Sequence, residues 1–128
     1  MAKAINWPEE FYEEILSEDS NSLKLALRLG SLYFDNAYYA DGDVVDVRVN
    51  HKIVRKARIV GDSRLSKIKD LTAENLSMCK NLLRNHADIA NFLANNYNQV
   101  VDQDALVTVI TYKNLNKEEA EIIDDPHL

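Results

Sequence analysis

Residues 23–30 read Leu-Lys-Leu-Ala-Leu-Arg-Leu-Gly, and this stretch decides the fold of the chain. Leucine occupies every second position, and a period of two is typical of a β-strand. The four leucines would lie on one face of that strand, with Lys24, Ala26 and Arg28 on the other. Gly30 would end the strand. The stretch therefore predicts a strand that carries two cations opposite its leucine face.

A helix is predicted before this strand. Pro8 suits a first helical position, and Glu9 and Glu10 would lie at the positive end of the helix dipole. Apolar side chains then recur at helical spacing, at Phe11, Tyr12, Ile15 and Leu16. We expect Trp7 to pack in the core beside this helix.

The rest of the chain adds strands and helices in turn. Two β-rich runs, 44–49 and 53–60, are separated by Asn50-His51, which indicates a tight hairpin. Asp70 or Thr72 would cap a helical segment whose apolar side continues to Leu83. A second helix is predicted at about 86–97 and a last strand at 106–112. This order predicts an α+β fold, with antiparallel strands that curl into a small open barrel flanked by helices.

Length and composition limit what the protein is. At 128 residues, with 46% hydrophobic and 28% charged residues, the chain suits one globular domain, here 1–115, followed by an acidic mobile tail over 116–128. Cys79 is the single cysteine, and the three histidines are scattered, which predicts no disulfide, no metal site and no cofactor. No signal peptide or membrane span is evident. We expect a cytoplasmic monomer without a membrane partner.

Several segments together resemble the ASCH family of PUA-like domains. These are residues 23–30, the run 40–49, the run 55–60, Ile68-Lys-Asp-Leu-Thr72, Tyr97 and the run 105–112. The resemblance implies a small β-barrel with flanking helices that binds RNA or nucleotides in a cleft beside the 23–29 strand. One branch of the family resembles an amidohydrolase that acts on acylated cytidine, so an enzyme acting on an acylated nucleoside is an alternative.

The family signature, Gly-x-Lys-x-x-x-x-Arg, is only partly matched. If Lys24 is its lysine, Ser22 replaces the glycine and Arg28 comes one residue early; if Arg28 is aligned, Leu23 replaces the lysine. Neither alignment leaves a threonine nucleophile beside a basic lysine, which argues against the hydrolase. For that alternative the candidate catalytic residues are Lys24 and Glu74, although Glu74 also suits the first turn of its helix.

The strongest charge feature lies between Arg48 and Lys69. This segment has eight Lys or Arg residues and one acid, a formal charge of +7, in a chain of net charge −6. It is either a nucleic-acid surface or edge protection that pairs with the acidic first helix or tail. Aromatic residues of the 31–42 loop would stack on bases or plug the barrel end. The candidate ligand-binding residues are Lys24, Arg28, Tyr33, Arg48, Lys56 and Arg58.

These observations leave three functions open. The first is an RNA- or nucleotide-binding module, the second is the amidohydrolase, and the third is a protein-interaction domain. Two cations at a cleft would suit a phosphate or carboxylate, whereas on a solvated strand face they would have no ligand. We favour the binding module, with RNA or a nucleotide as the partner.

Overall fold

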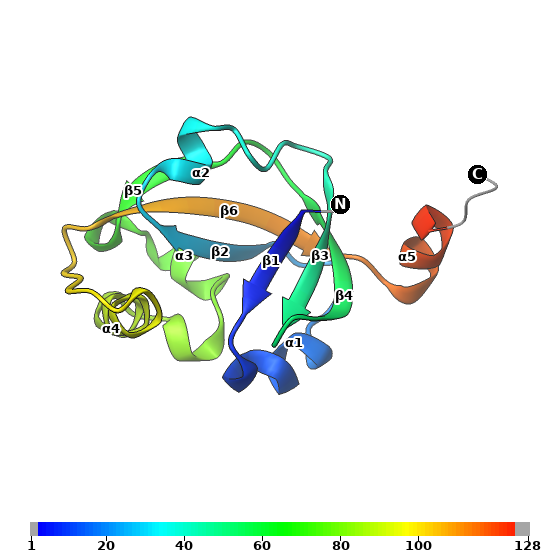
Figure 1. Ribbon diagram of the computed structural model, residues 1–128, viewed down its shortest axis with the longest axis horizontal. Coiled ribbons are helices and arrows are strands. Elements are labelled where there is room, and N and C mark those ends of the chain that lie inside the picture. The colour runs from blue at the N-terminus through cyan, green and yellow to red at the C-terminus, as the bar shows by residue number, and fades with distance from the viewer. Residues whose placement is uncertain (1–2, 125–128) are drawn as a thin grey trace.

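The computed structural model describes residues 3–124, which form an α+β fold built on one six-stranded, mostly antiparallel sheet (Figure 1). The strands are β1 Ala4–Trp7, β2 Lys24–Leu29, β3 Val44–Val49, β4 Lys52–Ile59, β5 Arg64–Lys67 and β6 Leu106–Asn114. The helices are α1 Tyr12–Ser17, α2 Leu32–Asp35, α3 Ala73–Ser77, α4 His86–Tyr97 and α5 Lys117–Asp124. Short 3-10 turns occupy Glu9–Phe11, Ile68–Asp70 and Asn81–Leu83.

The sheet is open, with strand order β1-β3-β4-β6-β2, and β5 pairs with β6 beyond the end of β4. β1 and β2 are the two outer strands, and among the described residues no ladder joins them. All neighbouring strands are antiparallel except β1 and β3, which are parallel. The sequence did not predict β1, because this strand is only four residues long and immediately precedes Pro8.

The predicted strand at residues 23–29 is confirmed as β2, but neither of its faces is fully solvated. Its leucine face is covered, with Leu25 3% and Leu27 6% exposed, and Ala26 on the opposite face is 0% exposed. The register places Ala26 beside Ile110, and both are fully buried. The Ala26 face is buried at its centre, whereas Lys24 and Arg28 near its two ends are partly exposed.

The hairpin at Asn50-His51 is confirmed. Both residues have positive φ, 51° and 66°, as the two central residues of a type I′ turn require. A register shift between Val47 and Arg48 marks a bulge next to this turn. β3 lies between β1 and β4, and β4 lies between β3 and β6. β3 is paired on both sides, whereas β4 pairs with β6 only over residues 57–59. Edge protection therefore does not explain Arg48 or Arg58, whose strands are paired on both sides at those positions.

The helical predictions are partly confirmed. Thr72 is the N-cap of α3, and its hydroxyl accepts a hydrogen bond from the Asn75 amide in a capping box. α3 ends at Ser77, although its apolar side was predicted to continue to Leu83. Those apolar residues are divided between α3 and a separate 3-10 turn, Asn81–Leu83. The second helix, α4, spans His86–Tyr97, as expected.

The beginning of the chain has a shorter helix than predicted. Pro8 precedes a 3-10 turn, and the α-helix proper covers only Tyr12–Ser17. Trp7 is 5% exposed, which confirms it as a core residue, and its ring meets Phe11 edge to face at 5.4 Å. The core therefore extends from the curled sheet to the first helix.

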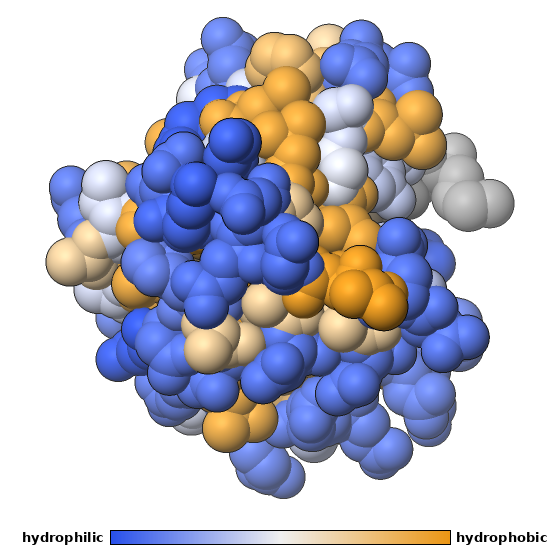
Figure 2. All heavy atoms as spheres, turned by 90° about the vertical axis from the view of Figure 1, so that its left-hand side faces the viewer, coloured by the Kyte–Doolittle hydropathy of each residue, from blue (hydrophilic) through white to orange (hydrophobic). Residues whose placement is uncertain are grey.

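The acidic segment after residue 115 contains α5, which ends at Asp124, and residues 125–128 lie outside the described residues. In Figure 1, α5 lies to the right of the sheet and away from the other helices. On the opposite side, Figure 2 shows a mostly hydrophilic surface crossed by a band of hydrophobic residues. No helix within residues 3–124 is both long and apolar enough to cross a membrane.

Candidate functional site

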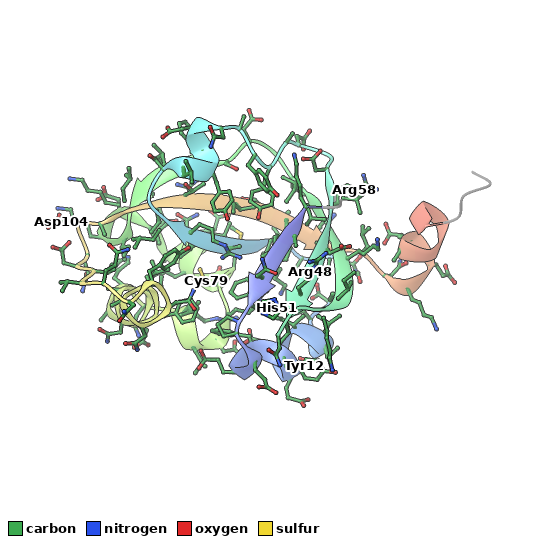
Figure 3. The ribbon with its side chains drawn as sticks, viewed as in Figure 1. Tyr12, Arg48, His51, Arg58, Cys79 and Asp104 are labelled. Carbon is green, nitrogen blue, oxygen red and sulfur yellow. The ribbon has the colours of Figure 1, made fainter. Side chains whose placement is uncertain are left out.

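Cations from three strands gather on the outward face of β3, β4 and β6. Arg58 lies opposite Val44 on β3 and opposite Lys113 on β6, and Lys56 lies opposite Asp46. Because side chains alternate along a strand, these residues share one face. We call Arg48, Lys56, Arg58 and Lys113 the cationic sheet face; Figure 3 labels Arg48 and Arg58 beside β3 and β4.

Asp46 is the acid at the centre of this face. Its side chain is 5% exposed, and its carboxylate lies 3.4 Å from an Arg48 guanidinium nitrogen and 3.4 Å from Lys56 Nζ. One carboxylate thus contacts two of the four cations of this face. Arg58 and Lys113 are exposed and directly opposite each other, an arrangement of like charges that is unfavourable without an anion. The face therefore has a net positive charge that could attract phosphate groups.

Arg55 points to the other side of the same strand and has a structural role. Its guanidinium donates to the Ile15 and Glu18 carbonyl oxygens at 3.0 and 2.8 Å, and to the Leu115 carbonyl oxygen at 3.3 Å. These bonds attach the end of α1 and the end of β6 to β4. Arg55 is therefore a packing residue of the basic segment, consistent with its opposite strand parity.

Arg28 connects the two outer strands of the sheet. Its guanidinium donates to the Leu27 carbonyl oxygen on β2 at 2.9 Å and to the Asn6 carbonyl oxygen on β1 at 3.0 Å. It also lies over the Trp7 ring, 5.5 Å from the ring centroid. Two of its donor nitrogens are occupied by backbone carbonyls, so Arg28 stabilises the seam between β1 and β2.

Lys24 lies at the other end of β2, opposite Tyr112. Neither Lys24 nor Arg28 is among the residues that line four cavities found among the described residues. Glu74 is exposed in the first turn of α3, and the Leu25 amide donates to the Met78 carbonyl oxygen at the end of α3 at 3.1 Å. The start of β2 thus meets α3, but among the described residues no hydrogen bond or ion pair joins Lys24 to Glu74.

Tyr33 belongs to a cluster of three tyrosines around α2. Its ring lies 5.3 Å from that of Tyr38 and 5.6 Å from that of Tyr39. Tyr39 is 3% exposed and donates to the Ala4 carbonyl oxygen on β1 at 2.7 Å; burial raises its pKa to about 12. Phe34 and Tyr38 remain 41% and 38% exposed. The loop thus plugs one end of the curled sheet and also presents two rings to solvent.

Sequence reasoning missed a buried polar cluster around Lys80. The Lys80 side chain is 0% exposed, and its Nζ lies 2.9 Å from the Glu18 carboxylate and 2.8 Å from the Tyr112 hydroxyl. The Trp7 ring centroid lies 4.2 Å from the same nitrogen. Burial lowers the pKa of Lys80, and Glu18 opposes that shift; burial raises the pKa of Tyr112 well above its usual value. The sequence signal that could have revealed this cluster is Lys80 itself, the one lysine on the otherwise apolar side of the helical segment predicted up to Leu83.

The structure divides the six predicted ligand-binding residues into four groups, one of which is Lys24 alone, at the start of β2 opposite Tyr112. Arg48, Lys56 and Arg58 share the cationic sheet face, to which Lys113 is added. Arg28 joins the strand edges, and Tyr33 packs within the tyrosine cluster. Within residues 3–124, no group of three or more His, Cys, Asp or Glu side chains is arranged to hold a metal ion.

Comparison with known proteins returned no match among protein-family models, curated proteins or solved structures.

Proposed function

We propose that the protein is an RNA- or nucleotide-binding module of the ASCH type, whose curled sheet is a small PUA-like barrel with its seam between β1 and β2. The observation that carries this proposal is the cationic sheet face, where four cations share one face with a single buried acid, Asp46, in an acidic chain. Local positive charge can bind a polyanion although the net charge of the molecule is negative. The single, buried Cys79 suits the reducing cytoplasm, where we propose that the protein acts as a monomer.

Phosphate contacts would come first in such a complex. Arg side chains offer paired N–H donors to phosphate oxygens, whereas Lys acts as a point charge. Four phosphate contacts would make log K fall against log salt concentration with a slope of about −3 for a single strand. The steep dependence on salt is the property that distinguishes this binding mode from apolar binding.

Bases would stack beside the phosphate contacts. Lys3 connects the exposed Tyr38 to the sheet, since its Nζ lies 5.0 Å from the Tyr38 ring centroid and 3.1 Å from an Asp43 carboxylate oxygen. Arg58 donates to the Gly42 carbonyl oxygen at 3.1 Å, in the same loop. The exposed rings and the cations are therefore on adjoining elements, and stacking contributes about 1–3 kcal/mol per base.

The test is binding of a labelled single-stranded RNA of about 12 nucleotides, measured by fluorescence anisotropy over a range of salt concentrations. The variant Arg58→Gln/Lys113→Gln should bind at least about tenfold more weakly and reduce the salt slope by about 1.4, because two phosphate contacts are lost. Both side chains are exposed, and so the variant should fold normally.

A matched control removes two cations from the same basic segment. Arg64 and Lys67 lie on β5, opposite Val109 and Leu106, near the other end of β6 from Lys113. Arg64→Gln/Lys67→Gln should keep nearly the wild-type affinity. Equal losses in the two variants would show that only the overall charge matters, and binding insensitive to salt would contradict the proposed phosphate contacts.

A further inference from the structure

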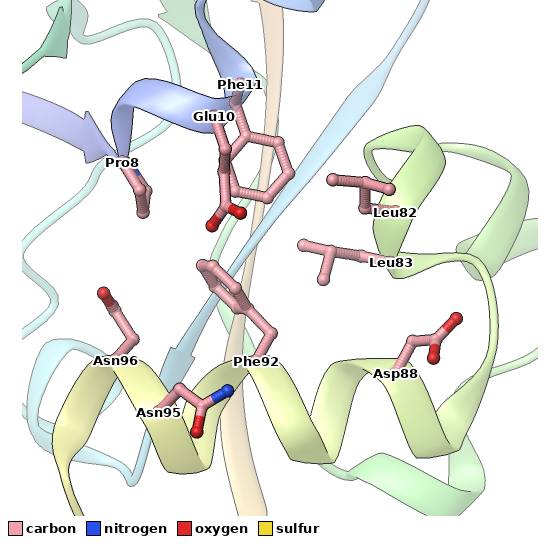
Figure 4. A pocket seen from close by; sticks show the side chains of 9 residues that line it. All are labelled: Pro8, Glu10, Phe11, Leu82, Leu83, Asp88, Phe92, Asn95 and Asn96. Carbon is pink, nitrogen blue, oxygen red and sulfur yellow. The ribbon is translucent and has the colours of Figure 1, made fainter.

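A groove between the first turn of the chain and α4 has a composition unlike the cationic sheet face. It has a volume of about 340 Å³ and is lined by Pro8, Glu10, Phe11, Leu82, Leu83, Asp88, Phe92, Asn95 and Asn96 (Figure 4). Its walls come from the 3-10 turn before α1, the 3-10 turn Asn81–Leu83 and one side of α4. These elements do not contribute to the cationic sheet face.

The floor of the groove is aromatic. Phe11 is 1% exposed, and its ring meets that of Phe92 edge to face with centroids 5.4 Å apart. Leu82, 57% exposed, extends the apolar surface at the rim. An exposed leucine beside aromatic rings offers a position for an apolar side chain of a partner.

The charged side chains that line the groove are both acidic. Glu10 and Asp88 come from opposite walls in Figure 4, and no Lys, Arg or His lines the groove. Glu9, on the same 3-10 turn as Glu10, is exposed and adds further negative charge. A cation is therefore favoured here, and its apolar stem could lie on the phenylalanine rings.

The rim also carries side-chain amides. Asn95 and Asn96 are exposed on consecutive positions of α4, and each amide has donors and an acceptor. Such groups match the N–H and C=O of a peptide main chain. The groove therefore fits an apolar side chain flanked by basic residues. The apolar floor would take the apolar side chain, the carboxylates on the two walls would take the basic groups, and the amides on the rim would take the peptide main chain.

We propose that this groove is a docking site for a basic peptide segment of a partner protein, in which Lys or Arg flanks an apolar residue. Charge complementarity selects this occupant: the rim repels nucleic acid, so the groove is separate from the proposed RNA-binding function. The protein would then hold a polyanion on its sheet and a basic protein segment against α4. In Figure 1, α4 lies at the lower left, below β6, and β3 and β4 lie at the right.

The experiment is an NMR titration of the full chain with the peptide acetyl-Gly-Arg-Leu-Arg-Gly-amide. Amide shifts should be concentrated at Leu82, Asp88, Phe92 and Asn95. Two control peptides replace arginine by glutamate or leucine by serine, and each should bind at least about tenfold more weakly. Shifts spread over the acidic surface, or equal binding of the glutamate peptide, would overturn the proposal.

Variants give an independent readout. Glu10→Gln should weaken binding of the arginine peptide about fivefold, which is the effect of losing one partly exposed ion pair. Glu13→Gln is the matched control, because Glu13 is an exposed acid of α1 outside the groove, and it should bind as the wild type does. Leu82→Ser should also weaken binding. Equal affinity of the Glu10 and Glu13 variants would contradict docking in the groove.

RNA binding by the Glu10 variant should be unchanged. This measurement separates the two proposals, since loss of peptide binding with intact RNA binding supports the groove alone. If instead RNA causes the shifts at Leu82 and Phe92, the assignment of a basic protein partner is wrong.

Discussion

At the scale of single residues, the least expected feature is a lysine in the core. Lys80 is completely buried, and its ammonium group contacts the Glu18 carboxylate and the Tyr112 hydroxyl. Asn114 donates to the other Glu18 oxygen at 3.2 Å. A buried pair of this kind contributes little net stability, but removing one partner leaves an uncompensated charge. The cluster therefore specifies how α1, β6 and the segment after α3 meet.

Glu18→Gln should lower the free energy of unfolding by about 3 kcal/mol, because Lys80 would then be charged, buried and without a carboxylate. This loss of unfolding free energy should become smaller as pH rises, since Lys80 then loses its proton and the neutral amine is tolerated in the core. Urea unfolding at several pH values measures both effects. The double variant Glu18→Gln/Lys80→Met should recover most of the loss, whereas the exposed Glu13→Gln should change stability by less than about 0.5 kcal/mol. If Glu18→Gln left the free energy of unfolding almost unchanged, the Glu18–Lys80 pair would not be essential for stability.

At the scale of secondary-structure elements, the seam between β1 and β2 is joined by side chains. Arg28 bonds to carbonyl oxygens of both strands, and the Tyr39 hydroxyl bonds to the Ala4 carbonyl on β1. Backbone groups at a strand edge need partners when they are removed from water. Arg28 and Tyr39 supply them, so these two residues are part of the framework of the fold.

Arg28→Met should lower the free energy of unfolding by about 1.5–3 kcal/mol, because hydrogen bonds from a charged donor are lost while the side-chain stem is kept. Hydrogen exchange at the amides of residues 4–7 should become faster than in the wild type, since β1 loses its connection to β2. Lys24→Met, on the same face of the same strand, is the control and should leave this exchange unchanged. Unchanged protection in Arg28→Met would mean that the seam does not depend on the guanidinium.

At the scale of the whole molecule, the core contains weak acids that folding keeps protonated. Burial raises the pKa of Cys79 to about 11 and that of Tyr39 to about 12, and it raises the pKa of Tyr112 well above its ordinary value. In the unfolded chain these groups lose their protons at lower pH. At these three groups the folded state thus binds more protons than the unfolded state above about pH 9. Their contribution to stability falls as pH rises in this range.

The contribution of these groups to the free energy of unfolding should be almost constant below pH 9.0, the ordinary pKa for Cys79, and should decrease through about pH 11. In Cys79→Ala the decrease between these values should be smaller, and the two curves should run parallel at lower pH. Guanidinium unfolding monitored by circular dichroism gives the comparison. Curves that remain parallel up to pH 11 would place the Cys79 thiol in contact with water.

The sequence by itself determined the elements whose signals are local. Strict alternation specified β2, the Asn50-His51 pair specified the hairpin turn, and Thr72 specified the start of α3, because strand period, turn chemistry and capping act over a few residues. Strand parity also placed Lys56 and Arg58 on one face. These parts of the cationic sheet face could be predicted.

Only the tertiary structure decided which residues are neighbours across the fold. Lys113 joins Arg58 because β4 pairs with β6 across a long stretch of chain, and Arg28 bonds to Asn6 because the curled sheet brings its two outer strands together. The burial of Lys80 likewise depends on Glu18 and Tyr112, which are remote in the sequence. Strand pairing and long-range hydrogen bonds have no signature in local spacing, so the roles of these residues became visible only in the folded chain.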